Sequence, residues 1–439
     1  MSIKVPLSII DQNELIKFLH LPKSNVKFCS EKYLYPYKIV EENKIEYIYI
    51  PFGFGMKYIR EKMGKDYRPA RNFFQKSSFM FDNAKLREHQ EVVKEEALNY
   101  INKYGHVMIS TYTGFGKTIM AIKLSSMINL QVLVITKGKK LITQWKEDIE
   151  KFSSDAKVQI IMPKDEIIEG KNFYIINSIN LEKIDVNFFK KIGLLIVDEA
   201  HLVMTEKCSS YFLNICPRYL ISLTATPYRY DDSDKLMMLF FGYKTLEDTY
   251  SEKDNPIIYR PLERKHYVYK IYSGFTPEIR LMENGRLDWN YILEQQANNI
   301  ERNNLIIKIV QRFKTNNFII LCKRISQAEY INDKLIECGE YSTILTGEKQ
   351  NFDKEARILV AITQTAGTGF NHPKLDSLIL ATDALNYYIQ FLGRVFRTET
   401  VVPNIFDILD NNNVLKKHYE KREEVYKKSM GEIKGIRIK

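Results

Sequence analysis

The fold is decided by the stretch Thr111-Tyr112-Thr113-Gly114-Phe115-Gly116-Lys117-Thr118, which joins an apolar run at residues 107–109 to a helix-prone segment at residues 119–127. A buried strand, a tight glycine turn and a helix start make a phosphate site, because the free N–H groups and the positive dipole end of the helix point at the anion. Lys117 would then reach the β- and γ-phosphates of a nucleotide, and the Thr118 hydroxyl would bind Mg²⁺.

One position departs from the full phosphate-loop motif, since Thr111 stands where that motif has its first glycine. The alternative is a plain glycine turn between a strand and a helix, with the lysine in solvent. The stretch alone leaves both interpretations open.

Apolar runs beyond this stretch alternate with helical segments. The first series has its runs at residues 132–135, 173–176, 194–197 and 219–223. A second series follows at residues 318–322, 342–345, 358–361 and 377–380. Short apolar runs between helices are typical of a parallel sheet that is covered on both faces. The sequence therefore predicts two α/β units in tandem.

Changes in pattern give the expected boundaries. Residues 1–83 form an N-terminal accessory module with β-prone runs, 84–245 the first unit, 246–300 a connector, 301–410 the second unit and 411–439 a basic tail. A solvated terminal helix is the favoured interpretation of the tail, and a contact with backbone phosphate is the alternative. Basic and aromatic side chains interleave between Tyr58 and Lys76, where they either bind nucleic acid or form a solvated basic face with the rings turned into the core.

Composition limits the class of protein. The chain of 439 residues has a net charge of +11, which suits a polyanionic partner, although an AT-rich genome also favours lysine. It has no apolar run of about 18 residues and no signal-peptide pattern, so we expect a soluble intracellular protein without a membrane partner. The five cysteines form no C-x-x-C pair, and neither a disulfide framework nor a structural zinc site fits them.

Two acids stand directly after the run at residues 194–197, in the sequence Asp198-Glu199-Ala200-His201. Ligands bind at the carboxyl ends of strands in open α/β sheets. Asp198 could hold the Mg²⁺ that bridges the phosphates, and Glu199 could polarise the attacking water. A helix N-cap is the alternative account of Asp198.

Two further groups complete the pattern. Thr224 and Thr226 follow the run at residues 219–223 and could link the nucleotide site to a partner domain, with a capped turn as the alternative. In the second unit, Arg394 and Arg397 lie three residues apart and share one helix face. Placed against the nucleotide, they would stabilise the charge that develops in phosphoryl transfer, whereas on a surface they are usually solvated or ion-paired.

This ordered set of motifs resembles that of the superfamily 2 helicases of DEAH type over residues 84–410. Within the superfamily the chain is most similar to the XPB-like branch and, closer still, to the poxvirus transcript-release DNA helicases and their relatives in large DNA viruses. The closer resemblance is carried by residues 114–118, 367–378 and 393–399 and by Ile50-Pro51-Phe52-Gly53-Phe54. Phe391 stands where the family often has arginine, and Asn371 where it often has aspartate.

The resemblance implies two RecA-like lobes with a small β-rich N-terminal module, and ATP and Mg²⁺ as cofactors. It assigns ATP binding to Arg87, Gln90, Thr113, Gly114, Phe115, Gly116, Lys117, Thr118, Gly369, Asn371 and Gln390. It assigns catalysis to Lys117, Asp198, Glu199, Arg394 and Arg397, the metal to Thr118 and Asp198, and coupling to His201, Thr224 and Thr226. Contacts with the nucleic-acid strand would come from Thr136, Lys137, Asn177, Ser178, Thr346, Gly347 and Thr363. Most of these contacts would be to phosphate and therefore independent of the base sequence.

We therefore predict an ATP-dependent DNA helicase or translocase, with DNA-stimulated ATP hydrolysis, that acts in viral transcription termination or transcript release. RNA polymerase or transcription factors are the expected protein partners, and a cytoplasmic viral factory or the virion is the expected location. The alternatives are a recombination or repair branch-migration helicase, an RNA helicase and, from another class, a catalytically inactive nucleic-acid-binding scaffold. A nuclease would have to be a partner, because no acid cluster in residues 1–83 has the form of a nuclease centre.

Overall fold

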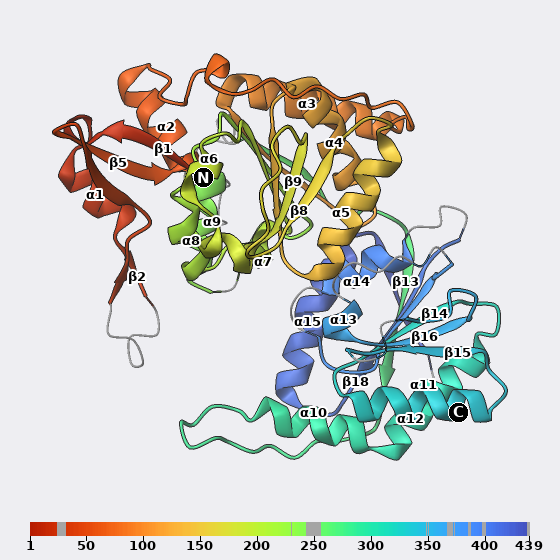
Figure 1. Ribbon diagram of the computed structural model, residues 1–439. Coiled ribbons are helices and arrows are strands. Elements are labelled where there is room, and N and C mark those ends of the chain that lie inside the picture. The colour runs from red at the N-terminus through yellow and green to blue at the C-terminus, as the bar shows by residue number, and fades with distance from the viewer. Residues whose placement is uncertain are drawn as a thin grey trace. The chain divides into compact units, whose positions relative to one another are not determined.

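The computed structural model describes residues 1–23, 32–229, 231–242, 256–347, 349, 351–366, 372, 374–384, 388–396 and 401–436, with the side chains of 388–390 excepted. The chain forms two compact units (Figure 1). Unit 1 comprises Met1–Thr111 and Phe115–Arg260, and unit 2 comprises Tyr112–Gly114 and Pro261–Lys439. No helix in the described ranges is long and apolar enough to cross a membrane.

Unit 1 contains a seven-stranded sheet in which every pair of neighbours is parallel, in the order β12-β6-β11-β10-β7-β9-β8. Alternate side chains face opposite layers: Leu133 and Ile135 join the core that contains Phe212 and Phe240, on the side of α7 to α9. The strands are β6 (His106–Thr111), β7 (Val132–Thr136), β8 (Val158–Ile161), β9 (Phe173–Asn177), β10 (Leu194–Asp198), β11 (Tyr219–Thr224) and β12 (Ile257–Arg260). The helices are α3 (Glu88–Tyr104), α4 (Lys117–Ile128), α5 (Lys139–Phe152), α6 (Val186–Phe189), α7 (Ala200–Val203), α8 (Glu206–Phe212) and α9 (Ser233–Phe241).

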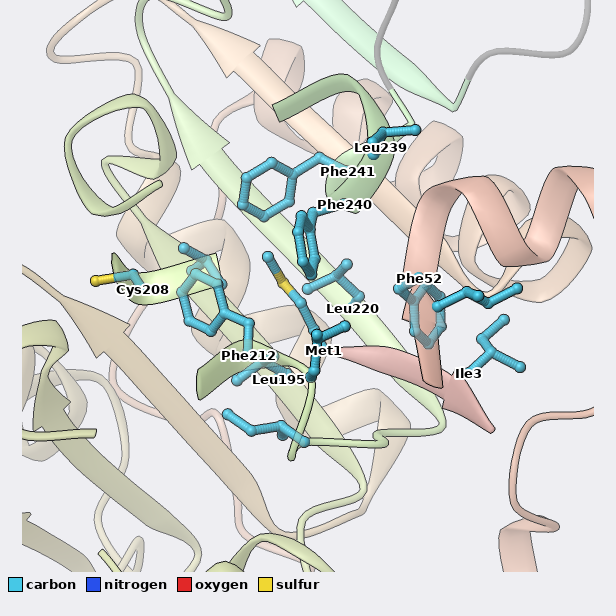
Figure 2. Close-up of a cluster of buried hydrophobic side chains, with 14 of the residues drawn as sticks. Met1, Ile3, Phe52, Leu195, Cys208, Phe212, Leu220, Leu239, Phe240 and Phe241 are labelled. Atoms are coloured by element: carbon cyan, nitrogen blue, oxygen red, sulfur yellow. The ribbon is translucent and has the colours of Figure 1, made fainter. Parts of the chain in front are cut away.

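The N-terminal module is β-rich, as predicted, but it shares a core with the first sheet. Met1, Ile3 and Phe52 belong to one buried cluster with Phe212 and Phe240 (Figure 2). The described part of the module contains a three-stranded antiparallel sheet, a two-stranded ribbon and two α-helices. These are β1 (Ser2–Pro6), β4 (Lys38–Glu42) and β5 (Ile45–Pro51), then β2 (Leu21–Pro22) and β3 (Tyr33–Leu34), then α1 (Gln12–Leu19) and α2 (Phe52–Met63). Because the apolar core is continuous, the module folds as part of unit 1.

Residues 64–83, here called the strap, run along the amino-terminal edge of the first sheet. Lys76 pairs with Leu130 just before β7, and the Asn172 amide, just before β9, donates to the Ser77 hydroxyl at 3.0 Å. Arg68 Nη1 donates to the carbonyl of Arg218, just before β11, at 3.2 Å. Arg68 and Arg71 therefore bind main chain of unit 1, whereas Lys65 and Lys76 are exposed, as the solvated face predicts. A contact of this stretch with nucleic acid stays a prediction.

Unit 2 contains a second seven-stranded sheet, again parallel throughout, in the order β15-β16-β14-β17-β18-β13-β19. Alternate residues of β14, such as Ile319 and Ile320, belong to different core clusters, so both faces are covered. The strands are β13 (His266–Tyr272), β14 (Phe318–Cys322), β15 (Ser342–Leu345), β16 (Ile358–Ile362), β17 (Ser377–Leu380), β18 (Asn404–Leu409) and β19 (Gly431–Gly435). The helices are α10 (Trp289–Asn298), α11 (Ile300–Arg312), α12 (Ile325–Glu337), α13 (Thr363–Ala366), α14 (Tyr388–Val395) and α15 (Asn413–Lys428). The prediction of two parallel-sheet units is confirmed.

The segment after Asp410 is built into unit 2. Helix α15 buries Leu415, Tyr419, Arg422 and Tyr426, and β19 pairs with β13. This differs from the solvated tail that the charges predict, because the buried arginine is paired with acids of the unit.

Candidate nucleotide site

The predicted nucleotide residues of unit 1 gather at one edge of its sheet. Strands β6, β11 and β10 are neighbours, and they end at Thr111, Thr224 and Asp198. The carboxyl ends of parallel strands lie at the same edge of a sheet, which is where open α/β sheets bind ligands. The fold therefore brings the phosphate loop, the two acids and the threonines together.

The phosphate loop is shaped by two glycines in the left-handed region, Gly114 with φ 93° and Gly116 with φ 100°. A Cβ at Gly116 would lie 2.3 Å from Gln90 Nε2, so a side chain there would displace the Gln90 amide as well as strain the backbone. Helix α4 begins at Lys117, whose Nζ donates to the Thr111 carbonyl at 2.9 Å. The lysine therefore lies back over the loop, which argues against the interpretation of a lysine in solvent.

Gln90 fixes the base of the loop. Its Oε1 accepts from the Arg87 N–H at 2.8 Å, and its Nε2 donates to the Phe115 carbonyl at 2.6 Å. The Gln90 side chain is buried, the Arg87 side chain is exposed, and the buried Phe115 ring packs edge-on against His89. Contacts of Gln90 or Arg87 with adenine stay a prediction.

Asp198 ends strand β10 and is 7% exposed. Its Oδ2 accepts from Trp145 Nε1 at 2.7 Å, and its Oδ1 accepts from the Glu199 N–H at 2.9 Å. Burial raises the pKa of the Asp198 carboxyl, the neighbouring Glu199 charge raises it further, and the Trp145 hydrogen bond and the Lys117 charge oppose the rise. A buried carboxylate with a raised pKa is a group that a bound cation would stabilise.

Glu199 has a left-handed backbone, with φ 48° and ψ 51°, at the start of α7. Non-glycine residues adopt this conformation at a cost of about 1–3 kcal/mol, and such strain clusters at functional sites. The Glu199 side chain is partly exposed, with its Oε2 3.5 Å from His201 Nδ1. The turn thus presents one acid to the interior and the next acid toward the sheet edge.

His201 joins this turn to strand β11. Its Nδ1 lies 2.9 Å from the Thr224 hydroxyl, which itself donates to the Thr226 carbonyl at 2.8 Å and accepts from the Thr226 N–H at 3.0 Å. Because the one hydroxyl proton goes to Thr226, Nδ1 is the donor in the first bond. Burial, with the charges of Arg229 and Lys117, lowers the pKa of His201 to about 3, so the ring is neutral at physiological pH.

The donor types at this edge fit a magnesium ion. Mg²⁺ prefers oxygen ligands such as carboxylates and hydroxyls, together with substrate phosphates. Asp198 offers a buried carboxylate of raised pKa, and Thr118 offers a hydroxyl in the first turn of α4.

The residues of unit 1 that are predicted to contact a nucleic-acid strand lie at the ends of β7 and β9 or directly after them, at the same sheet edge. Lys137 is exposed, and Asn177 accepts from the Ile179 N–H at 3.3 Å. Thr136 and Ser178 are buried, at 0% and 3% exposed. Of the four, only Lys137 has a side chain that is fully available to a ligand in this structure.

The predicted residues of unit 2 are described only in part. Thr346, which is buried, and Gly347 follow β15, and Thr363 opens α13 after the neighbouring strand β16. Arg394 lies on α14 and is 8% exposed. Gly369, Asn371, Arg397 and the Gln390 side chain lie outside the described residues.

Sequence analysis missed the residues that hold these groups in place. Trp145 lies on the buried face of α5 with Leu141 and Ile149, so its spacing indicates core packing and gives no sign of the bond to Asp198. Arg229 donates to the His201 carbonyl. Only its closeness to Thr226 in the sequence could have suggested this contact.

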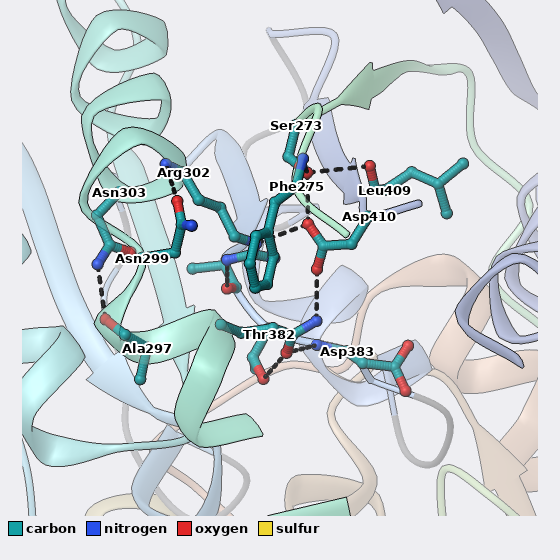
Figure 3. Close-up of polar contacts among 12 residues, drawn as sticks. Ser273, Phe275, Ala297, Asn299, Arg302, Asn303, Thr382, Asp383, Leu409 and Asp410 are labelled. Atoms are coloured by element: carbon teal, nitrogen blue, oxygen red, sulfur yellow. Dashed lines mark hydrogen bonds and ion pairs between the residues drawn. The ribbon is translucent and has the colours of Figure 1, made fainter. Parts of the chain in front are cut away.

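A buried polar network in unit 2 was also missed. Arg302 Nε donates to Asp410 Oδ1 at 2.8 Å, Gln296 donates to Asp410 Oδ2 at 2.6 Å, and Ser273 donates to Oδ1 at 2.5 Å (Figure 3). Arg302 also donates to the Ala381 carbonyl at 2.5 Å. These contacts fix the segment that follows β17.

Comparisons with known proteins place the chain. Residues 83–229 match the family described as type III restriction enzyme, res subunit. The chain is 38% identical to "Putative helicase 161L" of Invertebrate iridescent virus 6, with 100% of both chains covered. It is 30% identical to "Putative helicase 055L" of Frog virus 3, over 86% of this chain and 84% of that protein.

More distant likenesses agree with the fold. "Transcript termination protein A18" of Yaba-like disease virus is 24% identical, over 74% of this chain and 72% of that protein. The solved structure of S. cerevisiae Dbp5 bound to RNA and ADP BeF3 has a TM-score of 0.53 at 13% identity, over 78% of this chain and 89% of that chain. Each sheet with its helices is thus a RecA-like domain. The full-length relationship shows that the chain belongs to the viral helicase family of the 161L and 055L proteins, enzymes that hydrolyse ATP and act on nucleic acid.

Proposed function

We propose that this helicase moves along DNA by hydrolysing ATP at the carboxyl edge of the first sheet, and that it acts in viral transcription termination or transcript release. The observation that carries the proposal is the position of Lys117, held over the phosphate loop by the Thr111 carbonyl at 2.9 Å, at the same sheet edge as Asp198 and Glu199. A cation over a nest of backbone N–H groups is the usual means of binding a triphosphate.

Residues of the phosphate loop and of the strand ends of the first sheet divide the work of hydrolysis. Lys117 and the loop N–H groups hold the phosphates, with Gly114, Gly116, Thr113 and Phe115 shaping the loop. Thr118 and Asp198 would hold Mg²⁺, which when bound neutralises phosphate charge. Glu199 accepts the proton of the attacking water. His201 is a neutral Nδ1 donor to Thr224, which also bonds Thr226, so a change at the acids is passed to strand β11.

Residues of unit 2 are assigned on residue type. Arg394 and Arg397 serve as arginine fingers, since a guanidinium fits the charge that develops on the transferred phosphoryl group. Gly369, Asn371 and Gln390 contact the nucleotide, and Gln90 with Arg87 lies at the adenine. Contacts with the nucleic-acid strand come from Lys137, Asn177, Gly347 and Thr363. Thr136, Ser178 and Thr346 contact the same nucleic-acid strand through main-chain groups.

The role in transcription is supported by a relative named for transcript termination, the protein of Yaba-like disease virus. A DNA motor could release a transcript by pushing polymerase forward or by rewinding the DNA behind it. RNA polymerase or a transcription factor would then be a partner, in a viral factory or in the virion.

The test uses stalled transcription complexes of the viral RNA polymerase on a DNA template. We expect transcript release that needs hydrolysable ATP, is lost in Lys117→Ala and is kept in Lys123→Ala, a control on the same helix. Release by Lys117→Ala, or release without hydrolysis, would contradict the proposal.

Strand-separation assays with a forked DNA duplex, a four-way DNA junction and an RNA duplex then separate the rival motors. Preference for the junction would favour branch migration, and preference for the RNA duplex would favour an RNA helicase. A chain that binds nucleic acid but never turns over ATP would be the inactive scaffold.

A further inference from the structure

The indole of Trp145 makes a single directed contact at the nucleotide site. Its Nε1 donates to Asp198 Oδ2 at 2.7 Å, while the Glu199 N–H donates to Oδ1 at 2.9 Å. Trp145 is 1% exposed and lies on α5, a different element from strand β10 that carries the acid. The two donors approach the two carboxylate oxygens from separate parts of the fold, so they fix the plane of the carboxylate.

The chemical nature of the donor matters as much as its position. An indole N–H donates one hydrogen bond and carries no charge. An arginine or lysine in its place would neutralise the carboxylate and compete with a metal ion. The indole orients the acid and leaves its full negative charge for a cation.

Trp145 also packs in the core of unit 1, with Leu141 and Ile149 on the same helix face. Packing alone explains a large apolar ring at this site, but it does not require an N–H aimed at a carboxylate. Phenylalanine keeps most of the ring contacts and removes the donor, so Trp145→Phe separates the two accounts.

We propose that Trp145 is a positioning residue, which holds Asp198 in the orientation that binds the metal of the nucleotide complex. The inference rests on the proposed ATP site and adds a residue to it. Partners that orient metal ligands are typically worth about 10- to 100-fold in metal affinity.

The first test measures ADP affinity by calorimetry, with Mg²⁺ and with EDTA, for the full chain and for Trp145→Phe. We expect the gain in ADP affinity on adding Mg²⁺ to fall roughly 10- to 100-fold in Trp145→Phe, while the affinity in EDTA changes by less than about twofold. The control is Ile149→Val, which removes one buried methylene from the same helix face and should keep the full gain. A Trp145→Phe chain that keeps the gain within about twofold, or an equal loss in Ile149→Val, would overturn the proposal.

A second test does not depend on the stability of that variant. The chain has two tryptophans, so in Trp289→Phe the only indole is Trp145. We expect its emission to change when Mg²⁺ is added to the ADP complex, and to stay constant when ADP is added in EDTA. If the Trp145 emission does not change with Mg²⁺, in a chain that binds Mg²⁺ together with ADP, the positioning role is refuted.

The outcomes for the proposed function are distinct. A chain that binds no ADP, with or without Mg²⁺, removes the ATP site and the inference with it. A chain whose ADP affinity rises with Mg²⁺ in every variant keeps the ATP site and loses the role of Trp145.

Discussion

Each of the two parallel sheets has a buried aspartate, and the two acids accept hydrogen bonds from donors of different charge. Asp198, at the end of β10 in unit 1, accepts from two uncharged donors, and burial raises the pKa of its carboxyl. Asp407, in β18 of unit 2, accepts from Nε and Nη2 of Arg422, each at 2.8 Å, and from the Tyr426 hydroxyl. In the proposed site Asp198 is left for a cation from outside, whereas Arg422 supplies the cation to Asp407. Residue type and burial are therefore not enough to tell a binding site from a structural pair.

The largest effect is expected from Glu199→Gln in unit 1. Loss of the base should lower ATP turnover about 10²- to 10⁴-fold, while ADP affinity stays within about twofold. The like charge beside Asp198 disappears, so the melting temperature of unit 1, followed by Trp145 emission in Trp289→Phe, should hold or rise. If turnover is unchanged, or stability clearly falls, the acids of unit 1 act structurally as those of unit 2 do, and the proposed difference between the two sheets is wrong.

The matching change in unit 2 is Asp407→Asn, which removes the carboxylate that accepts from Nε and Nη2 of the buried Arg422 and leaves only Asp383, 3.0 Å from Nη1. Complete loss of the partner of a buried charge typically costs about 3–5 kcal/mol, and because Asp383 remains we expect a loss of roughly 2–3 kcal/mol. Trp289 stacks on His418 of α15, with ring centroids 5.0 Å apart. In a Trp145→Phe background the emission of Trp289 therefore follows the unfolding of this region. The control is Glu337→Gln, an exposed acid paired with Lys334, which should change stability by less than about 0.5 kcal/mol. Equal stability of the two variants would show that the pair is not structural.

Measuring the stability of unit 1 against pH tests whether His201, at the carboxyl edge of the first sheet, is buried and neutral. The pKa of His201 is lowered by burial to about 3 from 6.5, so the unfolded chain takes up the proton first. The stability that the neutral ring contributes is full above pH 6.5 and is lost as pH falls toward 3, at about 1.4 kcal/mol per pH unit. The raised pKa of Asp198 acts in the opposite direction, but it is common to the parent and to His201→Asn. Unit 1 should therefore lose stability between pH 6.5 and 5 faster in the parent than in His201→Asn, and parallel curves would contradict a buried neutral histidine.

The smallest effect concerns the opposite edge of the first sheet. Arg68→Ala removes the bond from the strap to the Arg218 carbonyl and the ion pair with Asp66 within the strap, at an expected cost of about 1–2 kcal/mol in the stability of unit 1. Turnover and DNA affinity should not change, because this edge lies away from the nucleotide site. A loss of DNA affinity would restore the interpretation of the basic stretch as a nucleic-acid surface.

The parts of this molecule that the sequence predicts are those set by local pattern. Apolar runs of strand length give both sheets, and the order of the strands then brings the phosphate loop to Asp198 and Thr224. Glycines at 114 and 116 are predictable because the turn needs a left-handed backbone.

The parts that could not be predicted depend on partners far apart in the sequence. Arg68, Arg302 and Arg422 have charges that indicate solvent by default, yet they bind a carbonyl or an acid about 15 to 150 residues away. Trp145 has the spacing of a core residue, and only the fold shows that its N–H faces Asp198. Sequence pattern thus gives the scaffold and the ligand-binding groups, whereas the residues that hold those groups in place need the structure.

In the proposed function, the carboxyl edge of the first sheet hydrolyses ATP in response to nucleic acid. The most direct measurement is steady-state ATP hydrolysis by the full chain, alone and with single-stranded DNA, duplex DNA or RNA, at one salt concentration, because binding to phosphate backbones depends steeply on salt. We expect turnover that DNA stimulates more than RNA. Stimulation by RNA alone would point to an RNA helicase, and no hydrolysis under any of these conditions would contradict the proposed ATP site.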